Sequence, residues 1–564
     1  MQTTIGEFLL TRLKQIGIDH IIGVPGDYNL QFLEQVPKVA GLGFVGTCNE
    51  LNAAYAADGY ARLAGVSALL TTYGVGELSA LCGVAGACAE HVPIVCITGA
   101  PPLFAMRRRW LLHHTLADGN FDNMAACYQH FTAAQTRLTP ANAATEIDRV
   151  LRACLLEKRP VYIQLPSDIS FLTIEVPDQP FALPEPASDP ARLAAALDHL
   201  SRLYAQARRP AVLLDMDAER FGLTGLLRAF IDRTQTPYAA LGTGKAILSE
   251  TDPLSLGLYV GGKSAPAVRE RIEHADFLLT TSPRFIESNS GSFTQSLPAE
   301  TINLGFHDVT VGATVYEGVV ARDLLAPFID QLPATPPRPP AHSPSVQPPT
   351  TLPPSSPLRQ ARIWRQLTGF LRPDDVVIAE AGTSNIGLTG EKLPPDVTYI
   401  ASNIWGAIGY TLPALLGTML AAPHRRHILF IGDGSFQLTA QELSTLLRLD
   451  LKPIIFLLNN GGYTIERFIL GMQAAYNDIA NWQYTGLPSI FAPGRAVQTF
   501  TVATEGELAA ALQAIAAGDK AALVELQLDP FDAPEGLKAF GPATAAFDYG
   551  PSGPQATPAA PTSE

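Results

Sequence analysis

The sequence predicts an α/β protein with three domains, each built on a mainly parallel sheet flanked by helices. The chain has 564 residues, more than one hydrophobic core holds, and 47% of them are hydrophobic while only 16% are charged. Short apolar runs that end in glycine alternate with helical patterns, which is typical of parallel sheets. A segment with 11 prolines in 25 residues separates the last third of the chain from the rest.

The first domain is expected to span residues 1–180. Apolar runs at 20–24, 68–74 and 93–99 are its expected buried strands. Between them, ELNAAYAADGYARLAG and GELSALCGVAGACAEH are rich in helix-forming and small residues. Strands that alternate with helices at this spacing indicate parallel pairing.

Two further domains follow. The middle domain, 190–332, has strand patterns in PAVLLDMDA, PYAAL and ADFLLTTS, and the proline-rich linker 333–357 should be stiff, extended and solvated. The third domain, 358–540, has strand patterns in VVIAEAG, TYIAS, HILFIGDG, PIIFLLNN and ALVELQLD. The remaining residues, 541–564, are rich in Pro, Ala, Gly and Ser, and we expect a disordered tail.

Charge and cysteine usage narrow the class of protein. The formal net charge of −14 argues against nucleic acid as a partner. No apolar stretch approaches the roughly 20 residues of a membrane span, and the N-terminal amphipathic segment lacks the apolar core of a secretory signal. The six cysteines include no C-x-x-C pair, so we expect free thiols and a cytoplasmic location.

Two glycine-rich turns follow apolar strands in the third domain. ILFIGDGSFQL runs from a strand into residues 432–435, and PIIFLLNNGGY ends in residues 459–462. The carboxyl ends of parallel strands are where α/β sheets bind ligands, and glycines let backbone amides approach a phosphate. Asp433, Asn460 and a backbone carbonyl are hard oxygen ligands that suit Mg²⁺ on a diphosphate. Each motif alone indicates an ordinary turn, but together they predict a ligand site.

The stretch LLHHTLADG, 111–119, places His113 and His114 side by side. A histidine without partners is more often structural or solvated than catalytic. Adjacent side chains diverge on helices and strands, so we do not expect the two imidazoles to share a metal ion, and we expect them to point apart. The pair is therefore interpreted through the rest of the chain.

GDGS followed by a helix, a strand and NN resembles the signature of enzymes that depend on thiamine diphosphate (ThDP). GVPGDYNLQFLEQV, CNELNAAYAADGYAR, LTTYGVGELSA, EHVPIVCITGAP, LLHHTLADG and NNGGYTIER resemble the 2-keto acid decarboxylases, of the branched-chain, indolepyruvate, phenylpyruvate or pyruvate type. The resemblance leaves only the proline linker and the tail unmatched. It implies a ThDP-binding fold with a pyrimidine-binding (PYR) domain, a middle domain and a diphosphate-binding (PP) domain.

The resemblance implies roles for individual residues. The family's cofactor-activating glutamate corresponds to Glu50, although the residue alone would be interpreted as a solvated helix start. Asp27, His113, His114 and Glu466 correspond to a proton relay, whereas the ordinary roles of Asp27 and Glu466 would be a helix N-cap and an exposed helical acid. The implied metal ligands are Asp433, Asn460 and the Gly462 carbonyl, and the implied cofactor contacts are Glu50, Thr383, Gly406, Ile408, Gly434 and Ser435.

The implied reaction is non-oxidative decarboxylation of a bulky 2-keto acid, branched-chain, aromatic or longer linear, to an aldehyde and CO₂. A ThDP-dependent carboligase, a pyruvate-preferring decarboxylase and a non-catalytic nucleotide-binding module are the alternatives. ThDP and Mg²⁺ are the implied cofactors. The family's sites lie between two chains, which implies a homodimer or homotetramer. The expected substrate pocket comprises Ala381, Asn385, Ile465, Ile469 and Phe540.

Three segments depart from the family's pattern. Ala381 and Asn385 are smaller than the family's usual residues, which leaves volume for a longer or branched substrate. The MRRRW run before the histidines, 106–110, is either a neutral mobile loop or a set of cations facing a carboxylate at the entrance. In relatives a helix continues over the active site at this place, and Gly541-Pro542 interrupts it here. The sequence therefore does not decide whether a helix covers the site.

Overall fold

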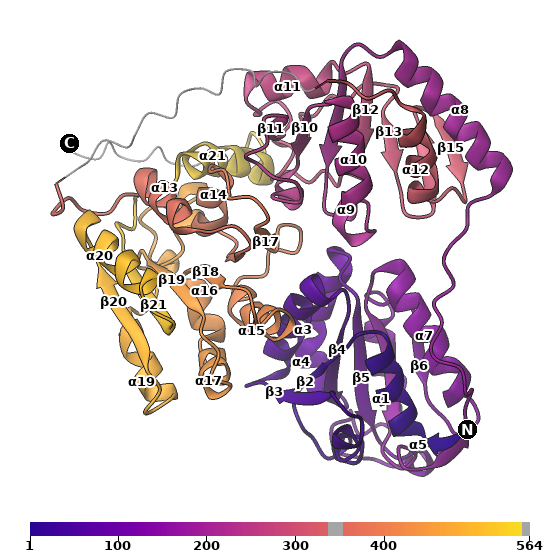
Figure 1. Ribbon diagram of the computed structural model, residues 1–564. Coiled ribbons are helices and arrows are strands. Elements are labelled where there is room, and N and C mark those ends of the chain that lie inside the picture. The colour runs from indigo at the N-terminus through magenta and orange to yellow at the C-terminus, as the bar shows by residue number, and fades with distance from the viewer. Residues whose placement is uncertain (337–352, 555–564) are drawn as a thin grey trace.

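Three large sheets, two with six strands and one with seven, form the centres of three domains, and a small two-stranded sheet adds to the first domain (Figure 1). The computed structural model describes residues 1–336 and 353–554. Each sheet is covered by helices, and the predicted architecture of three domains with mostly parallel sheets is confirmed. In Figure 1 the middle domain lies above the PYR domain, and the PP domain lies beside them.

The PYR sheet is wholly parallel, in the order β3-β2-β4-β5-β7-β6. Its strands are β2 (His20–Gly23), β3 (Gly43–Gly46), β4 (Ser67–Thr72), β5 (Ile94–Ala100), β6 (Gln135–Arg137) and β7 (Val161–Pro166). Its helices are α1 (Ile5–Gln15), α2 (Leu30–Leu33), α3 (Glu50–Ala64), α4 (Val75–Ala89), α5 (Leu103–Arg107), α6 (Asn123–Tyr128) and α7 (Ala143–Glu157). The short strands β1 (Gln2–Thr4) and β8 (Thr173–Glu175) pair antiparallel and fasten the two ends of the domain together.

The PP sheet repeats the same strand order, β17-β16-β18-β19-β21-β20, and is also wholly parallel. Its strands are β16 (Val376–Ala379), β17 (Thr398–Ile400), β18 (His427–Gly432), β19 (Ile454–Asn459), β20 (Val497–Val502) and β21 (Ala521–Gln527). Its longer helices are α13 (Gln360–Phe370), α14 (Thr383–Thr389), α15 (Thr411–Ala421), α16 (Asp433–Thr439), α17 (Glu442–Arg448), α18 (Thr464–Ile469), α20 (Glu505–Ala516) and α21 (Glu535–Tyr549). In both domains the strand order reverses beside the first strand, and such a switch point opens a crevice for ligands.

The middle sheet is mixed, in the order β11-β10-β9-β12-β13-β14-β15, with antiparallel pairing only at β13-β14-β15. Its strands are β9 (Pro210–Leu214), β10 (Tyr238–Ala240), β11 (Ser255–Leu258), β12 (Phe277–Thr280), β13 (Ile302–Leu304), β14 (Asp308–Val311) and β15 (Thr314–Glu317). Its helices are α8 (Pro190–Gln206), α9 (Asp217–Arg220), α10 (Thr224–Thr234), α11 (Pro266–Glu273) and α12 (Ala321–Gln331).

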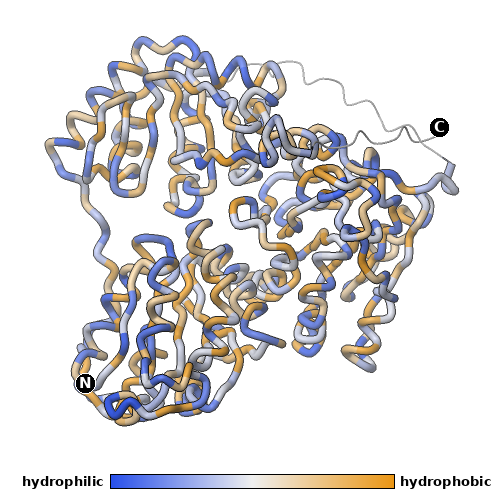
Figure 2. The backbone as a smooth tube through the Cα atoms, turned by 180° about the vertical axis from the view of Figure 1, so that it is seen from behind, coloured by the Kyte–Doolittle hydropathy of each residue, from blue (hydrophilic) through white to orange (hydrophobic). Residues whose placement is uncertain are grey.

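The PYR and PP domains share one hydrophobic core. Helix α3 packs along α15, and their buried alanines and leucines join a single cluster that reaches both sheets. The helix backbones touch because small residues face each other, so that a Cβ added to Gly59 would lie 2.2 Å from the Ala414 carbonyl oxygen. The middle domain has separate cores on the two faces of its sheet. Figure 2 shows hydrophobic segments running through the interior of all three domains.

The expectation of a disordered tail from residue 541 is wrong for its first part. Helix α21 continues through Gly541 and Pro542 to Tyr549. Gly541 is buried against α18, where a Cβ would lie 2.4 Å from the Phe468 carbonyl oxygen, so the packing between α18 and α21 uses the glycine and overrides the local cost of the proline. Most of the proline-rich linker, 337–352, and the end of the tail, 555–564, lie outside the described residues.

No helix in the described ranges is both long enough and apolar enough to cross a membrane. All six cysteines lie in described segments and are free thiols.

Candidate active site

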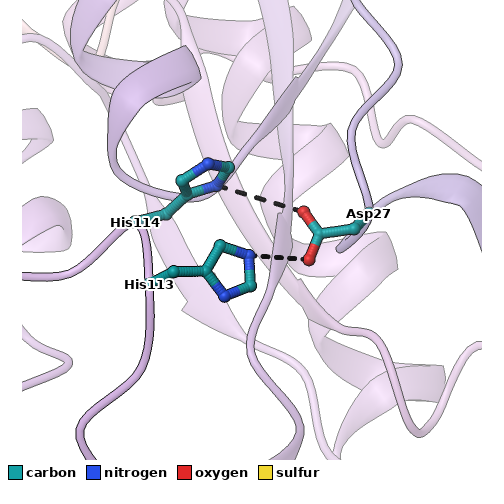
Figure 3. A group of neighbouring side chains, drawn as sticks. All are labelled: Asp27, His113 and His114. Carbon is teal, nitrogen blue, oxygen red and sulfur yellow. Dashed lines mark hydrogen bonds and ion pairs between the residues drawn. The ribbon is translucent and has the colours of Figure 1, made fainter.

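Asp27, His113 and His114 form a cluster at the carboxyl end of the PYR sheet (Figure 3). Nε2 of His113 lies 2.8 Å from Asp27 Oδ2, and Nδ1 of His114 lies 4.0 Å from Asp27 Oδ1. Asp27 follows β2, and the histidines follow α5, so residues 86 positions apart meet on one carboxylate. The His113 side chain is 58% exposed and the His114 side chain 31%, which leaves the cluster open to a ligand.

The two imidazoles converge, contrary to the expectation that they point apart. Their ring centroids are only 4.5 Å from each other. His114 adopts the left-handed conformation, with φ of 59°, which breaks the alternation of neighbouring side chains along an extended segment. The fold therefore brings two imidazoles together around one carboxylate.

A contact with Gly74 helps to fix the backbone at His114. Gly74 has φ of 64°, and a Cβ there would lie 2.0 Å from the His114 carbonyl oxygen. The backbones of Arg109 and Gly119 contact each other where the loop begins and ends. The contact is close, because a Cβ on Gly119 would lie 2.9 Å from the Arg109 carbonyl oxygen. Flanking side chains are held in one apolar cluster, formed by Tyr28, Tyr73, Ala100, Met106, Phe121 and Met124.

The two histidines have different partners. His113 stacks on Tyr28 with ring centroids 5.0 Å apart, and its Nδ1 lies 3.3 Å from the Tyr28 hydroxyl oxygen. Both ring nitrogens of His113 are therefore engaged. Nδ1 of His114 is buried and has no hydrogen-bond partner among the described residues. A buried polar atom without a partner is costly, and a bound ligand or water would satisfy it.

Glu77 lies beneath this loop, and the sequence did not single it out. Its Oε1 accepts a hydrogen bond from Gly74 N at 2.8 Å, and the Tyr162 hydroxyl donates to Oε2 at 2.5 Å. Burial raises the pKa of Glu77 from 4.5 to about 7. Glu77 lies three residues after Gly74 at the start of α4, a position typical of helix-capping acids. This spacing is visible in the sequence and could have identified Glu77.

Glu50 is the first residue of α3, directly after the capping residue Asn49. Its carboxylate borders Gly76, where a Cβ would lie 3.0 Å from Glu50 Oε1. The side chain is half-buried, and no hydrogen bond joins its carboxylate to the part of the chain that the structure describes. Glu50 is therefore a carboxylate left available at the edge of the PYR domain.

Three oxygens of the PP domain face one another. Oδ1 of Asn460 lies 2.9 Å from the Gly462 carbonyl oxygen and 3.1 Å from Asp433 Oδ1, while the Asn460 amide nitrogen lies 2.9 Å from the Thr464 hydroxyl oxygen. Turning the amide over would replace these oxygen contacts with hydrogen bonds from its nitrogen. In either orientation the Asn460 amide group lies 2.9 Å from the Gly462 carbonyl oxygen and 3.1 Å from Asp433 Oδ1, close to the spacing of about 2.9 Å between adjacent ligands of an octahedral Mg²⁺.

This group lies at the switch point of the PP sheet. Asp433 begins α16 directly after β18, and Thr383 begins α14 after β16, so both flank the crevice where the strand order reverses. Asp433 is buried, and burial raises its pKa from 3.8 to about 6 although backbone amides donate to it. Ser435 is also buried, and Gly434 packs so closely on Tyr463 that a Cβ would lie 2.6 Å from the ring.

The loop before α15 carries Gly406 and Ile408. Gly406 has φ of 66°, and Ile408 is 39% exposed despite being apolar. The carboxylate of Glu90 holds the start of this loop by accepting hydrogen bonds from Ile404 N and Trp405 N. Glu90 lies at the end of α4, so the loop is fixed by a residue of the PYR domain.

Part of the expected substrate pocket is an apolar group between α18 and α21. Ile465 and Phe540 pack around Phe468, Ala533 and Leu537, and Ile386 and Met472, which the sequence did not single out, join them. Ala381 and Ile469 are partly buried. Asn385 is engaged elsewhere, since its amide donates to Asn403 Oδ1 and accepts from the Tyr399 hydroxyl, both at 2.6 Å.

Glu466 lies on α18 next to this apolar group. Glu466 is exposed overall, but partial burial of its carboxyl, and secondarily the charge of Asp548 on α21, raise the pKa of Glu466 above its ordinary value. Within one chain, α5, which precedes the histidine loop, and α21, which packs on the helix that carries Glu466, lie far apart in Figure 1. The fold thus brings Asp27, His113 and His114 together, but it does not place them beside Glu466 of the same chain.

Family comparisons agree with this architecture. The models of the thiamine pyrophosphate enzymes match the N-terminal TPP binding domain at residues 3–125, the central domain at 197–324 and the C-terminal TPP binding domain at 381–526. Thiamine pyrophosphate is another name for ThDP.

Individual relatives cover almost the whole chain. An alpha-keto-acid decarboxylase of Mycolicibacterium paratuberculosis is 42% identical over 537 residues, 94% of this chain and 95% of the relative. Pyruvate decarboxylase isozyme 2 of Saccharomyces cerevisiae is 39% identical over 554 residues, 95% and 97% of the two chains. The structure of a ThDP-dependent 4-hydroxybenzoylformate decarboxylase of Rhodococcus jostii RHA1 superposes with a TM-score of 0.75 over 93% of this chain and 99% of that chain at 16% identity, which supports the fold.

The fold and these matches define a ThDP-dependent enzyme. The chain belongs to the ThDP-dependent 2-keto acid decarboxylase family, and it is a carboxy-lyase.

Proposed function

We propose that this enzyme releases CO₂ from a bulky 2-keto acid, branched-chain, aromatic or longer linear, and gives the corresponding aldehyde. The cluster of Asp27, His113 and His114 is the observation that carries the proposal. Aldehyde formation needs a proton to be delivered after CO₂ leaves, and imidazoles hydrogen-bonded to a carboxylate are suited to donate and accept protons. Carboligation needs no such delivery at the same point, so the cluster favours the decarboxylase over the carboligase.

Mg²⁺ and the ThDP diphosphate are assigned to the PP domain. Asp433, Asn460 and the Gly462 carbonyl would hold Mg²⁺, and their mutual spacing supports this assignment. Thr383, Gly434 and Ser435 would contact the diphosphate, and the Gly406 carbonyl and Ile408 would hold the rest of the cofactor. When bound, ThDP supplies a carbon nucleophile that adds to the keto group and accepts the electrons released with CO₂.

The metal assignment is tested by Asp433→Asn, which removes the charge and keeps the shape. The Mg²⁺ concentration that half-saturates ThDP binding should rise at least about tenfold, because Mg²⁺ loses its only charged protein ligand. Titration of cofactor binding by fluorescence measures it. Asp215→Asn is the matched control, since Asp215 is an equally buried acid of the middle domain. Unchanged Mg²⁺ dependence in Asp433→Asn would refute the assignment.

The proton-handling residues divide into two groups. Glu50 is proposed to activate the cofactor through its pyrimidine ring, which fits a carboxylate without a partner in the described chain. Asp27, His113, His114 and Glu466 are proposed to deliver and remove protons at the reacting carbon. The raised pKa of Glu466 suits a group that must hold a proton before it donates one.

The preference for a bulky substrate rests on the apolar wall of Ile465 and Phe540 and on the small Ala381. Ile469 would extend this wall, while Asn385 would act through its hydrogen bonds to Tyr399 and Asn403. Purified enzyme with ThDP and Mg²⁺, incubated with branched, aromatic, linear and pyruvate substrates, tests the proposal by CO₂ release. Highest kcat/KM for pyruvate would overturn the bulky preference, and absence of CO₂ from every substrate would overturn decarboxylation.

We further propose a homodimer or homotetramer with sites between chains, and a cytoplasmic location. The separation of α5 from α21 within one chain supports the assembly, because a second chain is needed to bring Glu466 to the histidines. The six free thiols support a reducing compartment. Sedimentation of the purified protein and cell fractionation test the two statements.

A further inference from the structure

Three consecutive arginines, Arg107, Arg108 and Arg109, lie directly before the histidine loop. All three are exposed, at the end of α5 and just beyond it. The Arg108 guanidinium lies 5.2 Å from the centre of the Trp110 ring. Within the described residues none of the three pairs with a carboxylate, whereas nearby Arg137 pairs with Asp122 at 2.8 Å. The run is therefore a local positive charge that the protein does not neutralise.

The fold keeps these charges close to the candidate active site. Arg109 is four residues before His113, so their Cα atoms are at most about 14 Å apart. The Arg109 backbone packs against Gly119. Met106, immediately before the run, is buried in the apolar cluster with Tyr28 and Phe121. The arginine backbone is thus anchored at both sides, and the side chains extend from a fixed point beside the site.

The surrounding charges make this run unusual. The whole chain carries a formal net charge of −14, which repels an anionic substrate. Close to the histidine loop, Asp27 pairs with His113 and Asp122 pairs with Arg137, which leaves Asp118 as the unpaired acid of the loop among described residues. Asp168, whose Oδ1 accepts a hydrogen bond from Leu103 N at the start of α5, is a second nearby acid without a cationic partner among the described residues. Three cations against these two acids give the entrance a positive local potential within about one Debye length of roughly 10 Å.

We propose that Arg107, Arg108 and Arg109 concentrate the carboxylate form of the 2-keto acid at the mouth of the site and favour substrates with a second carboxylate. The inference rests on the proposed decarboxylase function. A positive potential raises the local concentration of an anion by a Boltzmann factor, so a monoanion gains one factor and a dianion gains its square. The effect belongs to KM, because the arginines contact no reacting atom and leave kcat unchanged.

The test compares the wild-type holoenzyme with the triple variant Arg107→Gln, Arg108→Gln, Arg109→Gln. At an ionic strength of about 20 mM, KM for the best monoanionic substrate should rise about three- to tenfold, and the loss should vanish at about 500 mM. For a 2-keto acid with a second carboxylate, the rise in KM, or in the inhibition constant when it is used as a competitor, should approach the square of that factor. Inhibition by the neutral aldehyde product should not change.

Two variants separate charge from loop structure. The triple Arg→Lys variant keeps the charge and should restore the wild-type KM and salt dependence. The matched control, Arg192→Gln, Arg202→Gln, Arg208→Gln, removes three charges on or just after α8 at the other end of the molecule and should leave KM unchanged (Figure 1).

The outcomes distinguish the two proposals. If the wild type releases CO₂ and the glutamine variant keeps its KM and salt dependence, the arginine proposal is wrong and the decarboxylase proposal stands. The arginine proposal is also wrong if the glutamine variant loses as much affinity for the neutral aldehyde as for the anions, or if the lysine variant does not restore KM. Either result would show that the arginines act through the structure of the loop and not through their charge. If the wild type decarboxylates no 2-keto acid, both proposals fall.

Discussion

Adjacent residues in this site differ in the number of hydrogen-bond partners that their side chains have, and His113 and His114 differ most clearly. Both nitrogens of His113 have protein partners, in Tyr28 and Asp27. Nδ1 of His114 is buried and has no hydrogen-bond partner among the described residues; its contact with Asp27 Oδ1 is 4.0 Å long. His113 is therefore suited to orient the cluster, and His114 to meet the reacting molecule.

His114→Ala should lower CO₂ release about 100-fold or more, because a positioned proton donor contributes that much to turnover. ThDP binding should stay unchanged, since the proposed cofactor contacts lie elsewhere. Steady-state assays and cofactor titration measure the two effects. Tyr28→Phe, which removes only the hydroxyl beside His113, is the control and should cost much less. Loss of cofactor binding in His114→Ala would contradict the assignment.

Glu77 makes stability depend on pH. Burial raises its pKa in the folded protein from 4.5 to about 7, so the folded state holds the proton more tightly than the unfolded state. The resulting stabilisation is complete below pH 4.5 and is lost as pH rises toward 7, at most about 3 kcal/mol in all. Glu77→Gln should remove this part of the pH dependence.

Denaturant unfolding at pH 5 and pH 7.5 measures it. The wild type should lose more free energy of unfolding between the two pH values than Glu77→Gln does. The buried Glu380, whose pKa is also raised to about 7, is present in both proteins and cancels. The exposed Glu34→Gln should behave as the wild type, and equal pH dependence in Glu77→Gln would show that this carboxyl is not responsible.

At the scale of elements, the close contact between α3 and α15 depends on Gly59, which has no side chain to separate the helices. Gly59→Ala places a Cβ 2.2 Å from the Ala414 carbonyl oxygen, so the helices must separate. The free energy of unfolding should fall by about 1–3 kcal/mol or more. Gly225→Ala in α10 meets no atom within 4 Å and should leave Tm unchanged or slightly higher, by helix propensity. Calorimetry compares them, and equal Tm values would refute close packing.

Sequence patterns predicted the strands better than the loops and helix ends. Apolar runs followed by glycine-containing turns marked β18 and β19, and those turns held Asp433 and Asn460, because buried parallel strands impose a pattern on their own residues. Helix α21 was missed, since local rules gave weight to Pro542 and could not anticipate the packing of Gly541 on α18. The convergence of His113 and His114 depends on one left-handed residue and on Gly74, and neither is visible in side-chain periodicity.

At the scale of the whole molecule, the duplicated sheet order of the PYR and PP domains places a crevice at each switch point. Asp27 follows β2 beside one switch point and Asp433 follows β18 beside the other, and a shared core through α3 and α15 joins the two domains. Helix α5, which precedes the histidines, and α21, which packs on α18, lie far apart in Figure 1. This separation supports the proposal that a complete site is formed by two copies of the chain.

Mixing two inactive variants tests this requirement. Glu50→Ala inactivates the PYR half of a site, and Asp433→Ala inactivates the PP half. In a mixed dimer one site carries both substitutions and the other carries neither, so random exchange of chains should restore about one quarter of wild-type activity. Co-expression of the two differently tagged chains and CO₂ release measure it. Activity that stays at the level of the single variants would place each site within one chain, because every chain then carries a substitution in its own site.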